Sequence, residues 1–263
     1  MLPFLDLKFI QLPMYGICIA SAVIFAGVIS WFLIKYEKKC FWDFLIQATL
    51  VLAFGFIFAK ILFVLVSVPL KSVIPFLINN LIHPKESQIG AGFVFYGGIL
   101  GGILGMFLGA KIAKIRVSEF LNIFSIITPF VHAFGRLGCF CAGCCYGIPY
   151  DGFCAIKYSN PLSSAPINVP LFPVQLLESL LLFFLFVILL ILFIKKIKPL
   201  WAIYLCSYFV LRFFLEYLRY DYERGFLFSF STSQIISICG VFFVPILLLI
   251  LNHLKKQNRI ILY

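Results

Sequence analysis

Seven stretches of the chain are apolar over roughly the 20 residues that an α-helix needs to cross the hydrocarbon core of a membrane. The fourth is the shortest, and it runs directly into a segment rich in cysteine and glycine. A polar connection, residues 71–88, separates the second stretch from the third. The pattern predicts an all-α polytopic membrane protein with about seven transmembrane helices, at about 14–33, 44–69, 89–110, 120–134, 173–194, 200–218 and 233–251.

Basic residues gather after every second apolar stretch. Cytoplasmic loops of membrane proteins carry an excess of lysine and arginine, so this asymmetry indicates orientation. We expect the N-terminus outside, the C-terminus in the cytoplasm, and one membrane domain over residues 1–263 whose small extracytoplasmic head covers about 135–172. The clusters that carry this inference are Lys35, Lys38 and Lys39; Lys111, Lys114 and Arg116; Lys195, Lys196 and Lys198; and Lys255, Lys256 and Arg259.

Composition agrees with a membrane protein. The chain is 63% hydrophobic and 12% charged, whereas soluble domains are nearer half apolar and a quarter charged. A soluble core could not bury this excess, so lipid must be the solvent for much of it. The net charge of +11 would suit nucleic acid, but the basic residues form short clusters rather than a continuous basic face. We therefore expect membrane lipids, and no nucleic acid, as partners.

The sixth apolar stretch carries polar residues at helical spacing. Tyr208, Arg212, Glu216 and Arg219 are separated by four, four and three residues, which stacks them on one face of a helix. A self-neutralising arginine–glutamate pair is one interpretation. The other is an anionic ligand, because two arginines against one glutamate leave a positive charge and a guanidinium binds phosphate through two parallel hydrogen bonds.

Arg136 supplies a second cationic position, directly after the fourth stretch. An arginine at membrane depth is costly unless it has a partner or a task. It could extend to the membrane surface, but Gly135 and Gly138 leave its guanidinium uncovered, which favours a functional role. Elsewhere, Lys60 also needs a partner, and the four-residue spacing after Gly97 predicts close helix packing through small residues at Gly101, Gly105 and Gly109.

Four of the nine cysteines lie in the segment 135–147: Cys139, Cys141, Cys144 and Cys145. Their spacing is not a standard zinc or iron–sulfur pattern. Three interpretations stay open: small packing residues, disulfides in an oxidising extracytoplasmic compartment, or a metal or redox site.

The same segment, Gly135-Arg136-Leu137-Gly138-x-Phe140-x-x-Gly143-x-x-x-Gly147, resembles the signature of bacterial prolipoprotein diacylglyceryl transferases. Other motifs of that family are matched in order along about residues 14–240, and their joint occurrence is specific. They are Met14-Tyr15-Gly16, Tyr96-Gly97-Gly98, Pro173-x-Gln175-Leu176-x-Glu178, the series Tyr208, Arg212, Glu216 and Arg219, and Ser231-x-x-Gln234.

The resemblance implies a multi-pass enzyme of the bacterial cytoplasmic membrane. Its members transfer the diacylglyceryl group of phosphatidylglycerol to the lipobox cysteine thiol of a preprolipoprotein, forming a thioether and releasing glycerol phosphate. No metal or cofactor is implied. Arg136 and Arg212 would be catalytic by stabilising charge on the departing phosphate, with Tyr96 as a third catalytic residue. Positions implied to bind substrate are Arg136, Arg219, Glu216, Tyr208, Tyr15, Gly97, Gly98, Gly138, Gly143, Gly147, Gln175 and Glu178.

Three positions depart from the family motifs. Tyr96 stands where the family has a histidine, Cys139 where it has an asparagine, and Cys144 where it has a glutamate. A histidine suits proton transfer from a thiol near neutral pH, whereas a tyrosine with a pKa near 10 is a poor base. We therefore expect Tyr96 to donate a hydrogen bond to lipid. Two other functions remain open: thiol–disulfide exchange through the four cysteines, and binding or transport of an anionic lipid without catalysis.

Overall fold

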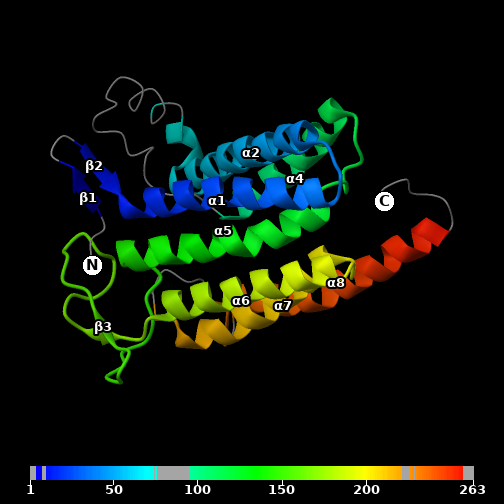
Figure 1. The fold of residues 1–263 in the computed structure, drawn as a ribbon. Helices are drawn as coiled ribbons and strands as arrows, with labels where there is room; N and C mark the ends of the chain where they lie inside the picture. Colours follow the sequence, from blue (N-terminus) through cyan, green and yellow to red (C-terminus); the bar gives the residue numbers. More distant parts are fainter. Residues whose placement is uncertain are drawn as a thin grey trace. The chain divides into compact units, whose positions relative to one another are not determined.

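Helices make up most of the described chain, which in this computed structural model comprises residues 4–7, 10–73, 75, 95–220, 226–227 and 229–256 (Figure 1). The only sheets among these residues are three two-stranded antiparallel pairs. The prediction of an all-α polytopic membrane protein is therefore confirmed. The long helices are α1 Met14–Tyr36, α2 Phe41–Ser67, α4 Phe95–Ala113, α5 Leu121–Ala142, α6 Val174–Ile194, α7 Leu200–Leu215 and α8 Thr232–Lys256.

Six of these helices are long and apolar enough to cross a membrane, against the seven stretches expected. The missing one is α4, whose apolar part, Gly97–Ala113, is shorter. The expected third stretch began at residue 89, and residues 76–94 lie outside the described part of the chain. The side on which each terminus lies stays a prediction.

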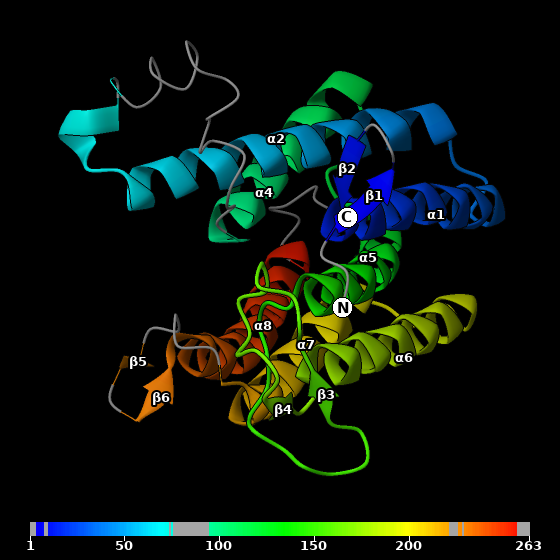
Figure 2. The same cartoon turned by 90° about the vertical axis from the view of Figure 1, so that its left-hand side faces the viewer.

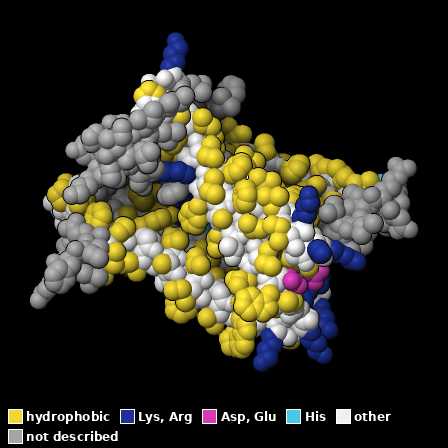
Figure 3. Space-filling view, turned by 90° about the horizontal axis from the view of Figure 1, so that it is seen from above, with side chains coloured by type: hydrophobic (Ala, Val, Ile, Leu, Met, Phe, Trp, Pro, Cys, Tyr) yellow, Lys and Arg dark blue, Asp and Glu magenta, His cyan; other side chains and the backbone are white. Residues whose placement is uncertain are grey.

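The surface has the character that lipid contact requires. Hydrophobic side chains are spread widely over the described part of the face seen in Figure 3. Large apolar side chains on several helices, such as Phe32, Phe242 and Leu249, are more than half exposed. Water would penalise apolar exposure on this scale, so these faces fit a hydrocarbon environment.

Helix α5 is longer than expected and changes the picture of the cysteine-rich segment. We expected the fourth stretch to end near residue 134, but the helix continues to Ala142 and includes Arg136 and Gly138. Gly143 follows the last helical residue, and its φ of 73° suits glycine. The backbone N–H groups of Gly143 and Cys144 both donate to the Cys139 carbonyl oxygen, at 2.9 and 3.1 Å. The prediction that this helix ends near residue 134 was therefore wrong, because residues 135–142 are also helical.

The contacts divide the chain into two units, which we describe separately. The larger unit holds α1, α5, α6, α7 and α8, and α5 packs against α1, α6 and α7. Figure 2 shows α5 between α1 and α6. The contacts of α5 are apolar along most of its length, with Ile123 and Ile126 fully buried. A strand pair, β1 Phe4–Leu7 with β2 Ile10–Pro13, leads into α1.

The chain between α5 and α6 folds over a small apolar core of its own, made by Tyr146, Tyr158, Ala165 and Leu171. It contains the short pair β3 Ile156–Lys157 and β4 Pro170–Leu171. Backbone hydrogen bonds also tie it to the end of α7: Ile148 N–H donates to the Leu218 carbonyl, and Tyr220 N–H to the Tyr146 carbonyl, both at 3.0 Å. A third pair, β5 Phe226–Leu227 with β6 Phe230–Ser231, leads into α8.

The smaller unit is built on α2 and α4, followed after α2 by the one-turn helix η1 Leu70–Ser72. Gly97, Gly101, Gly105 and Gly109 recur every four residues along α4, and each lies against the backbone of α2. A Cβ atom at Gly109, for example, would lie 2.6 Å from the Gln47 Cα. The predicted packing through small residues is confirmed.

Replacing Gly101 by alanine should loosen this helix pair. The new Cβ would overlap the carbonyl oxygen of Phe54, so α2 and α4 must move apart, at a cost of about 1–3 kcal/mol. Thermal unfolding in detergent should register the loss. The matched control is Gly102→Ala, whose Cβ would make an ordinary contact of 3.8 Å with Val51 Cγ1. Equal melting temperatures for the two variants would contradict the packing described.

Candidate active site

A buried ion pair joins α5 to α6 in the larger unit. Arg136 Nε lies 3.0 Å from Glu178 Oε2, and the side chains are 14% and 3% exposed. Buried charges are tolerated only when they are paired, so each residue explains the presence of the other. The sequence motifs contain both residues, but their pairing was not predicted.

Arg136 uses only part of its hydrogen-bonding capacity in this pair. A guanidinium carries five N–H donors, and the contact with Glu178 engages the Nε side. The hydroxyl of Tyr208, on α7, lies beside the same guanidinium. The remaining donors can serve a ligand with several acceptor oxygens, such as a phosphate.

Arg212 forms a second buried pair, on α7. Its Nη2 lies 2.8 Å from Glu216 Oε2 and donates a hydrogen bond of 3.1 Å to Ser233 Oγ on α8. Within the described chain, its Nη1 is buried and has no hydrogen-bond partner. A buried, unpaired donor is costly, and an anionic ligand would satisfy it. The Arg212–Glu216 pair is the one that the sequence spacing indicated.

Arg219 does not continue this helical face, contrary to the prediction. α7 ends at Leu215, the one-turn helix η4 Glu216–Leu218 follows, and Arg219 is extended, with φ −92° and ψ 149°. The physical reason is the pairing of this backbone with the chain after α5, through the bridge between Arg219 and Gly147. Arg219 is thereby placed near Cys145.

His132 completes the group, one helical turn before Arg136. Its Nε2 lies 4.0 Å from Glu178 Oε1, and its ring meets that of Tyr208 edge-on, with centroids 5.1 Å apart. No sequence pattern singles it out as a site residue, because a single histidine in an apolar stretch has no periodic partner. We define the polar cluster as His132, Arg136, Glu178, Tyr208, Arg212 and Glu216.

Several other predicted site residues have structural roles in the larger unit. Gln175 Nε2 donates a 2.8 Å hydrogen bond to the Cys144 carbonyl, which fixes the turn after α5. Gly138 makes room for Tyr15, since a Cβ there would lie 2.8 Å from the Tyr15 Cδ2. A Cβ at Gly143 would overlap Ser163, and one at Gly147 the Phe172 carbonyl. Substrate contacts by these residues remain predictions.

Tyr96, Gly97 and Gly98 belong to the smaller unit. Tyr96 lies in the first turn of α4, and its side chain is outside the described part of the structure. The close approach of α2 accounts for the glycine at position 97, whereas a Cβ at Gly98 would meet only ordinary contacts of 3.8 Å. Lys60 lies on α2 with its Nζ 4.8 Å from the Phe63 ring centroid.

The cysteines gather at the end of α5. The sulfur atoms of Cys139, Cys144 and Cys145 all lie within 4.8 Å of one another, because Cys145, with φ 55°, turns the chain back over the helix end. All nine cysteines are free thiols in the structure. The disulfide interpretation thus finds no support in this structure, while three converging thiols leave a metal or redox site open.

Hydrogen bonds among these thiols shift the pKa values of Cys144 and Cys145 in opposite directions. Hydrogen bonds from Cys139 and Cys144, followed by the charges of Arg219 and Arg136, lower the pKa of Cys145. The pKa of Cys144 is raised, chiefly by its hydrogen bonds with Cys139 and Cys145. In the adjoining segment, burial raises the pKa of Tyr158 to about 12.

Cys145 should therefore be the thiol of this group that alkylating reagents modify first. The thiolate is the reactive form, and the lowered pKa gives Cys145 a larger thiolate fraction below pH 8 than an ordinary thiol of pKa about 8.5 has. Iodoacetamide labelling between pH 5 and 9, read by peptide mass spectrometry, measures this directly. Cys139→Ser should alter the profile. A Cys145 profile rising only above pH 8 would contradict the assignment.

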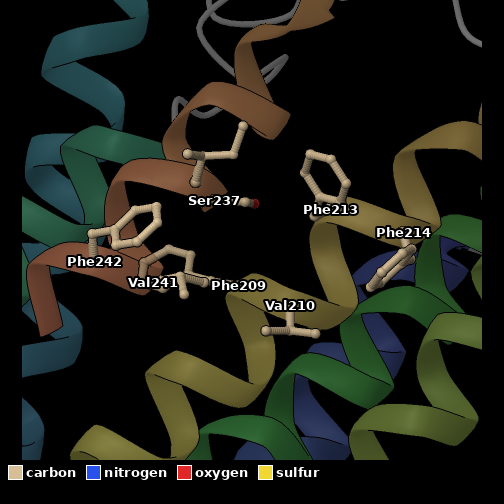
Figure 4. A pocket seen from close by; sticks show the side chains of 8 residues that line it. Phe209, Val210, Phe213, Phe214, Ser237, Val241 and Phe242 are labelled. Carbon is tan, nitrogen blue, oxygen red and sulfur yellow. The ribbon is translucent and has the colours of Figure 1, made fainter. Parts of the chain in front are cut away.

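An apolar groove lies between α7 and α8, with a volume of about 190 Å³. Figure 4 shows phenylalanine side chains from both helices around it, together with Ser237. The lining has no charged residue: Phe209, Val210, Phe213, Phe214, Ser237, Ile238, Val241 and Phe242. Its chemistry suits a hydrocarbon chain.

The fold and the polar cluster define an integral membrane protein with a cationic site buried among its helices. Comparison with known proteins identifies its family. Residues 3–251 match the family described as prolipoprotein diacylglyceryl transferase. The chain belongs to that family, and it is a transferase.

Curated relatives carry the same name, phosphatidylglycerol–prolipoprotein diacylglyceryl transferase. The protein of Clostridium tetani is 34% identical over 68% of this chain and 73% of its own length. A second protein of that name, from Clostridium perfringens, is 38% identical over 65% of this chain and 67% of its own. One from Dehalococcoides mccartyi is 27% identical over 94% and 92%.

Proposed function

We propose that the polar cluster is the site at which this chain transfers the diacylglyceryl group of phosphatidylglycerol to the lipobox cysteine of a preprolipoprotein. The observation that carries the proposal is the pair of arginines held by carboxylates, Arg136 by Glu178 and Arg212 by Glu216, with Arg212 Nη1 buried and without a hydrogen-bond partner among the described residues. We further propose that the enzyme works in the bacterial cytoplasmic membrane, with the catalytic end of the helices on the outer side.

Arg136 and Arg212 would bind the phosphodiester of the donor lipid. The acceptor sulfur attacks the glyceryl carbon next to the phosphate, a C–S bond forms, and the C–O bond breaks with its electron pair on the phosphate oxygen. Glycerol phosphate leaves, and its extra negative charge is what the two guanidinium groups stabilise. Glu178 and Glu216 act as positioning residues that fix the arginines before the lipid binds.

The acyl chains need an apolar surface that continues from the phosphate site. The groove lined by Phe209, Phe213 and Phe242 begins on α7, the helix that also carries Arg212. One acyl chain can lie there while the headgroup reaches the arginines. This arrangement also suits lipid binding without catalysis, but membership of a transferase family favours transfer.

Reconstitution with defined lipids tests the proposal. The purified protein, in vesicles containing phosphatidylglycerol, is incubated with a lipobox peptide, and mass spectrometry follows the diacylglyceryl adduct. We expect adduct with phosphatidylglycerol and none with phosphatidylethanolamine alone, whose headgroup is zwitterionic. Absence of adduct, under conditions in which the Clostridium tetani relative is active, would overturn the proposal.

A cysteine-free variant of the α5 end separates transfer from thiol–disulfide exchange. With serine at Cys139, Cys141, Cys144 and Cys145, a disulfide-exchange protein would lose all function. Transfer should persist, because the arginines of the polar cluster carry it. Complete loss with retained folding would favour the redox function instead.

A further inference from the structure

His132 is the residue of the polar cluster that the proposed function leaves without a role. It lies on α5, with its side chain 20% exposed, and its Nε2 faces Glu178 Oε1 at 4.0 Å. Glu178 Oε1 is buried and has no hydrogen-bond partner within the described chain. The carboxylate therefore uses Oε2 for Arg136 and leaves Oε1 directed at the imidazole.

The proposed reaction needs a group that removes a proton from the acceptor thiol. A thiol of pKa about 8.5 is mostly protonated at neutral pH, and only the thiolate is an effective nucleophile. The motif position of the family histidine holds Tyr96 in this chain. Of the other histidines, His83 lies outside the described residues, and His253 lies near the far end of α8.

Resting on the function proposed above, we propose that His132 is the general base for the acceptor thiol and that Glu178 is its positioning residue. The carboxylate at Oε1 favours the tautomer that carries its proton on Nε2, and Nδ1 is then the acceptor nitrogen. The separation of 4.0 Å must shorten by about 1 Å to form a hydrogen bond, as apo-state contacts of catalytic groups commonly do.

The step balances without a further reagent. Nδ1 takes the thiol proton, the sulfur electron pair forms the C–S bond, and the C–O electron pair leaves with glycerol phosphate. The imidazolium then returns its proton to the departing phosphate or to water. Glu178 stabilises the imidazolium while it exists. One carboxylate thus serves both His132, which acts on the attacking thiol, and Arg136, which acts on the leaving phosphate.

The charged groups around His132 are those of the polar cluster. Glu178 approaches from α6, Arg212 and the Tyr208 hydroxyl from α7, and Arg136 from the next turn of α5. Helix α1 also packs on α5, but its only charged residue is Lys35 in its last turn. If the transfer rate depends on pH below pH 8, this dependence should therefore report the protonation of His132 together with its electrostatic coupling to these groups.

The experiment compares an ordinary acceptor peptide with one that carries selenocysteine, whose selenol is ionised at neutral pH and needs no base. With the cysteine acceptor, His132→Asn should lower the rate constant of transfer by about 100- to 10,000-fold, with little change in KM for phosphatidylglycerol. With the selenocysteine acceptor, His132→Asn should regain most of the wild-type rate. Arg136→Ala should regain none, since it acts on the leaving phosphate.

The pH profile gives a second readout, which needs no variant. The wild-type rate with the cysteine acceptor should fall as acid protonates the base, and this fall should disappear with selenocysteine. For His132→Asn the cysteine rate should keep rising towards pH 9, as the solution supplies thiolate. His132→Gln serves where the asparagine variant folds poorly.

Three results would overturn the assignment. The first is unchanged activity of folded His132→Asn, and the second is no recovery of its rate with the selenocysteine acceptor. The third is a Tyr96→Phe variant that loses transfer to cysteine and regains it with selenocysteine, which would make Tyr96 the base. Failure of the wild type with both acceptors is a different outcome. It would refute the proposed function and with it this inference.

Discussion

Arg136→Ala should abolish most diacylglyceryl transfer, lowering the rate constant by about 100- to 1,000-fold, the effect of removing one donor to a developing oxyanion. The variant should also be less stable, because Glu178 loses the partner 3.0 Å away and a buried charge without its partner costs about 3–5 kcal/mol. Transfer to a lipobox peptide and thermal unfolding measure the two effects separately.

A double variant separates chemistry from stability. Arg136→Gln with Glu178→Gln removes both charges and should recover much of the stability lost in Arg136→Ala, while activity stays absent. Lys157→Ala, in β3 and away from the cluster, should leave both properties near wild type. Recovery of transfer together with stability would mean that Arg136 acts only by holding the fold.

Arg212→Lys should lower kcat/KM for phosphatidylglycerol by about 10- to 100-fold, although the charge is kept. A lysine ammonium is a single point of charge and cannot reproduce the planar fork of a guanidinium. Here that fork reaches Glu216 at 2.8 Å and Ser233 at 3.1 Å from Nη2, and leaves Nη1 for the ligand. Steady-state rates over a range of donor lipid content in the vesicles provide the measurement.

The matched control is Ser233→Ala, which removes only the hydroxyl that accepts from Arg212. Loss of one such bond costs about 0.5–1.5 kcal/mol, so its effect should be about tenfold or less. If Arg212→Lys were no more harmful than Ser233→Ala, the phosphate would not be bound through Nη1.

Much of the fold could be predicted because it depends on local composition. Long apolar stretches must be helices in a membrane, since no other open structure satisfies the backbone there. Regular spacing also revealed the Arg212–Glu216 pair and the glycine contacts of α4, because residues four apart in a helix share a face. These features require no knowledge of distant parts of the chain.

The features that were missed depend on tertiary contacts. The apolar stretch ends near residue 134, but packing against α1, α6 and α7 keeps α5 helical to Ala142. Backbone pairing with Gly147 draws Arg219 out of the helix. The partners Arg136 and Glu178, and the place of His132 beside them, follow from how α5 and α6 pack, which no local pattern encodes.

The backbone bonds between the chain after α5 and the end of α7 have a consequence for lipid selection. They link Ile148 to Leu218 and Tyr146 to Tyr220, and so they clamp together the ends of the two helices that carry Arg136 and Arg212. The spacing of the two guanidinium groups is then set when the protein folds, and binding does not have to order them. A headgroup binds only if it fits between two guanidinium groups whose spacing is fixed. Donor lipids with a larger group attached to the phosphate should therefore lose transfer abruptly rather than gradually.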